Sequence, residues 1–461
     1  MPVFAGSLTS FILGAPILGL IGVWGFLYQK EAVPQFLKIM HAHVTWWSLI
    51  ILIISLLLPG LLIKSWFRRF IIVGSFLVFP LYVIAMSIHY AVIEPMAVNV
   101  SAIGSFFISP YGAVVFALEI LFFATTVIVG LSAIGVKLSF VYEPNPKPST
   151  YDLTSDITIS PRAILGYLVF LVIAVCLGLF ILGQFTLQHK AVDPAALVQL
   201  HTHIGIFALG FLMIILAMNA LGVKQKIITL AENLGIISLA VTVLGFLAFI
   251  YLGMPSIVWV APAMLYFVVL AIGWLSTLGK FGLKPDGEHF NFVRVSMAVI
   301  WGALLLFVLA GPYLALQYDT TSNVTVSYKQ TSGAPYIGAY PDPEKYPGSA
   351  PNVHTPRGVE NFHLSPSGWA HTAIFWLVVI LLFGPRIFGG IGAPHLLFML
   401  ATIIPMAPII NSIGRIGAWS GLAFGIGPLY LVGHPLKTLN VLILLIVTIL
   451  WIRFAKQQDR V

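Results

Sequence analysis

Residues 28–64 read YQKEAVPQFLKIMHAHVTWWSLIILIISLLLPGLLIK, and this stretch decides the fold class. From position 41 to position 63 it contains two histidines but no Asp, Glu, Lys or Arg. A helix needs about 20 apolar residues to cross the hydrocarbon core of a bilayer. The apolar residues are continuous rather than alternating with period two, which disfavours a barrel strand. The stretch therefore predicts a membrane-spanning helix that opens with a His-x-His motif.

The composition of the whole chain supports the same fold class. Of the 461 residues, 59% are hydrophobic and 8% are charged, whereas soluble domains carry about 25% charged residues. A water-soluble globule, a disordered chain, collagen and a coiled coil are all excluded by these values. The net charge of +8 is interpreted as the Lys/Arg excess of cytoplasmic loops. We therefore expect a lipid bilayer, and no nucleic acid, as the chain's environment.

Similar apolar runs recur along the sequence and predict an all-α, polytopic membrane protein with about 12 transmembrane helices in one transmembrane domain spanning 1–461. The predicted spans are 7–28, 41–64, 70–94, 111–138, 162–185, 201–222, 229–253, 256–278, 294–317, 367–388, 393–411 and 436–455.

The distribution of basic residues predicts the orientation in the cell membrane. With the N-terminus inside, 15 of the 23 Lys and Arg residues lie on the cytoplasmic side, as the positive-inside rule requires. Both termini are then cytoplasmic, and loop 318–366 is extracytoplasmic. Acceptor triplets for N-glycosylation begin at Asn99 and Asn323, a pattern that is common by chance.

The His-x-His motif belongs to an internal repeat. Residues 187–207 read LQHKAVDPAALVQLHTHIGIF, which shares Gln, Lys, Ala-Val, Pro, Leu and His-x-His with residues 28–47. A third helix opens similarly, with one histidine, at His371. His203 follows His43 by 160 residues and His371 follows His203 by 168. Each interval holds four predicted spans, so we expect three pseudo-symmetric four-helix repeats.

Histidines at matched positions on membrane helices suggest a bound metal or haem, because ionisable groups at membrane depth are costly and are usually functional. Imidazole is a common metal ligand and a haem axial ligand. The single cysteine, Cys176, excludes intrachain disulfides and Cys-ligated metal centres. Haem b suits an apolar slot between helices, with one group and at most two expected. A copper or zinc site formed by His41, His43, His201 and His203 remains an alternative.

Two further features bear on such a site. Residues i and i+2 of a helix point about 200° apart, so His41 and His43 cannot easily bind one ligand if both are helical. Glu119 lies within an apolar span. It is suited to proton transfer or to a hydrogen bond with a ligand. Alternatively, it is a protonated carboxyl bonded to the backbone or to a tyrosine.

Twelve helices, a threefold repeat and outer-side histidines on the second, sixth and tenth helices resemble subunit I of the haem-copper oxidases. The resemblance implies that His43, or its neighbour His41, and His371 are the two axial ligands of a low-spin haem. It also implies that Arg415, in the outer loop before the last helix, pairs with the haem propionates. His201 or His203 matches the family's copper ligand on the sixth helix.

The sequence also departs from that family. Trp369 stands where the family places its high-spin haem ligand, and the seventh span contains no histidine. The sixth span has no tyrosine and the eighth has no lysine. These differences disfavour an oxygen-reducing, proton-pumping centre and disfavour copper, while the positions of the low-spin haem are kept.

The first functional hypothesis is therefore a haem-binding electron-transfer subunit of a respiratory complex, an oxidoreductase component. Its partners would be other subunits of the complex and a quinol, cytochrome or copper-protein partner on the outer side. The alternatives are a divergent terminal oxidase or nitric oxide reductase with unusual metal ligands, and a haemless scaffold or metal- or haem-handling protein. A transporter is the least favoured, because the polar groups gather at the outer face rather than at the membrane midplane.

Overall fold

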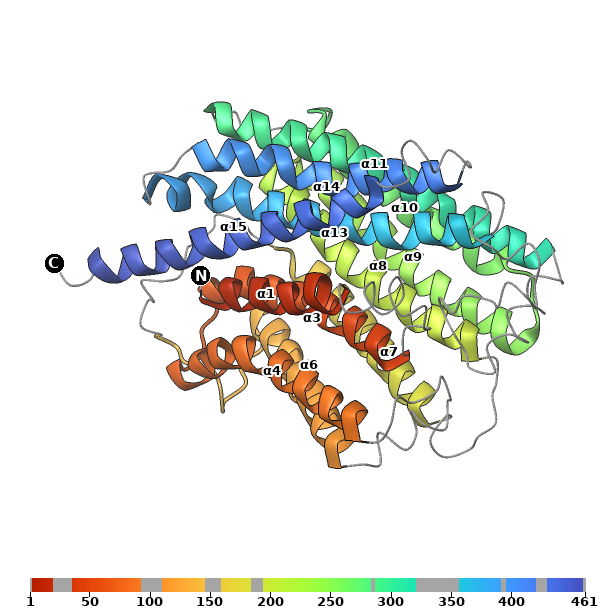
Figure 1. The fold of residues 1–461 in the computed structure, drawn as a ribbon, viewed down its shortest axis with the longest axis horizontal. Helices are drawn as coiled ribbons and strands as arrows, with labels where there is room; N and C mark the ends of the chain where they lie inside the picture. The colour runs from red at the N-terminus through yellow and green to blue at the C-terminus, as the bar shows by residue number, and fades with distance from the viewer. Residues whose placement is uncertain are drawn as a thin grey trace. The chain divides into compact units, whose positions relative to one another are not determined.

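The described part of the chain folds almost entirely into helices (Figure 1). The computed structural model describes residues 2–19, 35–92, 110–145, 159–183, 194–282, 287–320, 356–390, 395–419 and 429–458. Within these ranges eleven helices are long and apolar enough to cross a membrane, and Pro2–Ile17 forms a shorter apolar helix. The described residues contain no β-strand, only an isolated bridge between Ile63 and Tyr142. The predicted all-α membrane fold is confirmed.

The described residues fall into two compact units, each of which is described by itself. Unit 1 comprises residues 1–156, 176–192 and 441–461, and unit 2 comprises residues 157–175 and 193–440. Two helices contribute residues to both units, namely α7 (Pro161–Gly183) and α15 (Leu429–Gln458).

Unit 1 is built around the N-terminal helices. Helix α1 packs against α3 and α4. Helix α4 also packs against α6, and these two helices lie side by side in the orange part of Figure 1. Gly6 of α1 has no room for a Cβ because the side chain of Ser75 occupies that space. The helices of unit 1 are α1 (Pro2–Ile12), the π-turn η1 (Leu13–Ile17), α3 (Gln35–Leu57), the 3₁₀ turn η2 (Leu58–Gly60), α4 (Ser65–Val92) and α6 (Pro110–Ala133).

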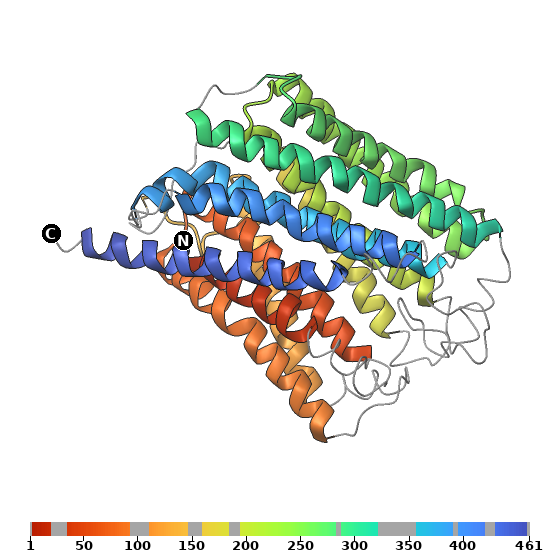
Figure 2. The same cartoon turned by 45° about the horizontal axis from the view of Figure 1, so that its top comes forward.

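Unit 2 is built around two of its own helices, α8 and α13, which are the most buried of the candidate spans. Helix α13 packs against α8, α11 and α14, and Figure 2 shows α11, α13 and α14 side by side. The helices that lie wholly in unit 2 are α8 (Pro194–Ala220), α9 (Gln225–Leu252), α10 (Ile257–Thr277), α11 (Gly287–Thr320), α13 (Pro356–Gly390) and α14 (His395–Trp419).

Several helices extend beyond the apolar runs that predicted them. Helix α3 begins at Gln35 rather than at position 41, and α13 begins at Pro356 rather than at position 367. The expected loop 318–366 is therefore shorter at both ends, and residues 321–355 lie outside the described residues. Helix α14 continues to Trp419, so Arg415 lies on a helix and not in a loop. Hydropathy detects only the stretch inside the hydrocarbon, whereas helical hydrogen bonding can continue into the headgroup layer.

We expect a cysteine introduced into segment 321–355 to face the outside of the cell. The background variant replaces Cys176, which is exposed on α7 and is the chain's single cysteine, with serine. An impermeant thiol reagent should label the new cysteine in intact right-side-out vesicles, because the excess of Lys and Arg is predicted to hold the opposite loops inside. A cysteine placed after Arg453 serves as the control and should react only after lysis. The reverse pattern would contradict the predicted orientation.

Candidate functional site

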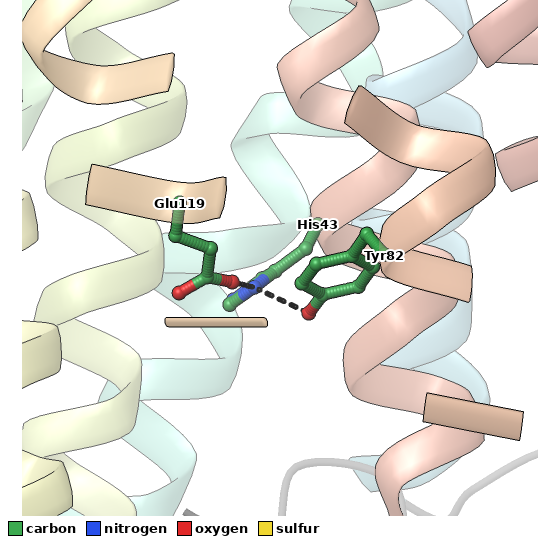
Figure 3. Close-up of polar contacts among 3 residues, drawn as sticks. All are labelled: His43, Tyr82 and Glu119. Atoms are coloured by element: carbon green, nitrogen blue, oxygen red, sulfur yellow. Dashed lines mark hydrogen bonds and ion pairs between the residues drawn. The ribbon is translucent and has the colours of Figure 1, made fainter. Parts of the chain in front are cut away.

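The first candidate site, here called the His43 cluster, joins three helices of unit 1 (Figure 3). His43 on α3 lies with its Nδ1 3.1 Å from Oε1 of Glu119 on α6. The hydroxyl oxygen of Tyr82 on α4 lies 3.4 Å from the same nitrogen. Tyr82 is buried, while the side chains of His43 and Glu119 are 32% and 22% exposed. A carboxyl, an imidazole and a phenol therefore meet on membrane-spanning helices, and the first two are partly exposed.

An aromatic layer one helical turn away holds the three helices in register. It consists of Trp47, four residues after His43, Phe79, three before Tyr82, and Phe122, three after Glu119. The rings of Trp47 and Phe122 have centroids 4.6 Å apart, and those of Phe79 and Phe122 are 5.4 Å apart. Such ring pairs stabilise packing beyond the area that they bury. The polar groups thus meet because adjacent aromatic residues fix α3, α4 and α6.

The first histidine of each His-x-His motif makes the same contact in both repeats. The Nδ1 of His41 lies 2.7 Å from the carbonyl oxygen of Gly14, and the Nδ1 of His201 lies 2.7 Å from that of Ala174. In both cases the partner precedes the histidine by 27 residues. The equal spacing supports the repeat inferred from sequence. The predicted divergence of the two histidines also holds, because His41 and His43 bond to different helical elements.

The second histidine of the later motif faces the corresponding helices but meets aromatic rings. His203 on α8 packs against Phe207, which is four residues later, Phe246 on α9 and Trp259 on α10. Phe246 and Trp259 stack with centroids 4.0 Å apart. His203 thus has aromatic neighbours on α9 and α10, where His43 has Tyr82 on α4 and Glu119 on α6.

The second candidate site, here called the His371 cluster, is buried in unit 2. The Nδ1 of His371 on α13 lies 2.8 Å from the carbonyl oxygen of Ser367, to which it donates if protonated. The Nε2 of His371 and the hydroxyl of Tyr266 on α10 are buried and lack hydrogen-bond partners among the described residues. Both atoms converge on Gly210 of α8. A Cβ there would lie 3.1 Å from Nε2 and would collide with the Tyr266 hydroxyl.

The predicted axial ligands thus occupy different surroundings. His43 faces Tyr82 and Glu119 within unit 1, while His371 faces Gly210 and Tyr266 within unit 2. That they share one iron stays a prediction. The side chain of Arg415 lies outside the described part of α14. Among the residues that the structure describes, no three His, Cys, Asp or Glu gather closely enough to hold a metal ion.

Sequence reasoning missed several residues of these sites. Tyr82 and Tyr266 carry no sequence signal that separates them from other aromatic residues in apolar spans. Lys437, which is not one of the residues named in either cluster, does carry such a signal, because it is a lysine within a span and such residues are usually functional. It is buried on α15 with its Nζ 4.1 Å from the ring centroid of Trp369, a cation–π geometry.

Comparison of the chain with protein-family models, curated proteins and solved structures finds no match.

Proposed function

We propose that this chain is a haem-binding membrane protein that transfers electrons within a respiratory complex, with His371 and His43 as axial ligands of a low-spin haem b. The observation that carries the proposal is the burial of His371 with an unpartnered ring nitrogen. Its imidazole is buried in an apolar helix bundle, and its Nε2 has no hydrogen-bond partner among the described residues. A buried polar atom without a partner is costly, and coordination to iron would remove that cost.

The residues around His371 fit the role of an axial ligand. With its proton on Nδ1, the ring donates to the carbonyl oxygen of Ser367, which leaves the lone pair on Nε2, the usual arrangement for a metal-bound histidine. Gly210 has no side chain beside Nε2, and the Tyr266 hydroxyl reaches the space that a Cβ there would take. A porphyrin supplies four nitrogens itself, so one or two histidines complete the coordination of its iron.

The chain's own residues would set the conditions for electron transfer. A bis-imidazole haem supplies a one-electron iron couple whose potential depends on the axial ligands, the polarity around it and hydrogen bonding. Ser367 fixes the tautomer and the direction of the His371 ring. Burial of α8 and α13 would limit the access of water to the site. His41, His201 and His203 are held by backbone carbonyls or aromatic rings and are assigned no ligand role in this proposal.

A visible absorption spectrum of the purified, dithionite-reduced protein tests the proposal. We expect the sharp α and β bands of a low-spin b-type haem. Carbon monoxide binding together with stoichiometric copper would instead support a divergent oxidase or nitric oxide reductase. A colourless protein after expression with added haem precursor would exclude the proposal and favour a haemless scaffold or a metal-handling protein.

We expect Arg415→Ala to weaken haem retention or to shift the haem midpoint potential. Arg415 lies near the end of α14, and by resemblance its guanidinium would pair with a propionate as a bidentate donor. Arg415→Lys is the matched variant, because it keeps the charge and loses the bidentate geometry. Haem content and redox titration measure the effect. Wild-type occupancy and potential in Arg415→Ala would remove Arg415 from the site.

A further inference from the structure

We propose that Glu119 is a positioning residue for His43, which holds its imidazole by a charge-assisted hydrogen bond and thereby lowers the midpoint potential of the iron that His43 binds. This inference rests on the proposed haem function and deepens it. Tyr82 completes the arrangement as the second oxygen near Nδ1. Figure 3 shows the three side chains converging from separate helices.

The geometry determines which nitrogen of His43 would meet a metal. Nδ1 lies 3.1 Å from the Glu119 carboxyl and 3.4 Å from the Tyr82 hydroxyl. A metal ligated through Nε2 requires the ring proton to sit on Nδ1. The Glu119 carboxylate then accepts that proton's hydrogen bond, and the Tyr82 oxygen lies close enough to assist. Carboxylate–histidine–metal arrangements of this kind fix the ring and raise its basicity.

The second repeat supplies an internal contrast. His203 occupies the same place in its motif as His43, faces the two following helices in the same way, and meets Phe246 and Trp259. Aromatic side chains therefore pack against the second histidine of this motif, on the helices that correspond to those of Tyr82 and Glu119. A carboxyl within a membrane span is costly, so Glu119 calls for a role beyond packing, and its bond to His43 provides one.

The charge on Glu119 gives the direction of the effect. A negative partner on Nδ1 makes the imidazole a stronger donor, which stabilises ferric over ferrous iron. Removal of the charge should therefore raise the midpoint potential. We expect Glu119→Gln to favour the ferrous form by about tenfold, which corresponds to about 59 mV for a one-electron couple.

Redox titration of the purified full-length protein, followed through its haem bands, tests the assignment. Glu119→Gln keeps an amide oxygen that can accept the Nδ1 hydrogen bond, so it should retain haem at a raised potential. Glu119→Leu removes both the charge and the bond, so it should raise the potential and also accelerate loss of haem to apomyoglobin. Tyr82→Phe should produce a smaller upward shift. The control is Glu232→Gln, the same change at a buried carboxyl of α9 outside the His43 cluster, and it should leave the potential unchanged.

The outcomes separate this inference from the function on which it rests. Full haem occupancy with an unchanged potential in Glu119→Gln would overturn the role of Glu119 and leave the haem proposal standing. An equal shift in Glu232→Gln would also overturn it, because the effect would then not depend on His43. A wild-type protein that binds no haem would overturn both.

Discussion

Replacement of His371 by alanine should abolish the spectrum of the proposed low-spin haem completely. The imidazole is buried on α13, its Nδ1 is held by Ser367, and no hydrogen bond competes for its Nε2 among the described residues. Loss of one axial ligand converts a six-coordinate low-spin iron into a five-coordinate one or releases the haem. His43→Ala should have the same spectral effect if both histidines bind one iron.

The measurement is a reduced-minus-oxidised spectrum of each purified variant, normalised to protein, with the low-temperature electron paramagnetic resonance spectrum of the oxidised form. His395→Ala is the matched control, because His395 is exposed at the start of α14. It should keep the wild-type spectrum. Size-exclusion profiles in detergent establish that the variants remain folded. A low-spin spectrum that survives in His371→Ala would refute the ligand assignment and the proposed function's main support.

The second large effect is expected at Gly245, where two helices of unit 2 touch at their backbones. A Cβ at this position would collide with the carbonyl oxygen of Val258 and would lie 2.8 Å from the Cα of Trp259. Backbone atoms cannot move aside as a side-chain tip can, so Gly245→Ala must separate α9 from α10. Overpacking of this kind costs about 1–3 kcal/mol and sometimes more. The shift would also disturb Trp259, which packs against His203.

Gly74→Ala on α4 is the control for that prediction. Its nearest neighbour would be the side chain of Val78 at 3.9 Å, an ordinary contact distance, and alanine is the better helix former by about 1 kcal/mol. We expect the unfolding midpoint in detergent to fall sharply for Gly245→Ala and to stay level or rise for Gly74→Ala. Equal unfolding midpoints for the two variants would show that α9 and α10 do not approach each other as closely at Gly245 as the structure places them.

The sequence was sufficient for the features that depend on one helix at a time. An apolar run such as 41–63 must be helical in a bilayer, because a lipid-exposed backbone has to satisfy its own hydrogen bonds. Helical geometry likewise predicts that His41 and His43 diverge, and the structure gives them separate partners. The similarity between residues 28–47 and 187–207 predicts equivalent surroundings, which His41 and His201 have.

Only the tertiary structure decides which side chains meet between helices. Nothing local to Glu119 identifies His43, 76 residues earlier, as its partner, or brings Tyr266 and His371 to Gly210. In a soluble protein the apolar stripe of a helix shows which face turns inward. Within a bilayer that signal is lost, because lipid tails are as apolar as the protein interior and helices associate through close packing and polar contacts. The spans could therefore be predicted from the sequence, whereas the neighbours of Glu119 and His371 could not.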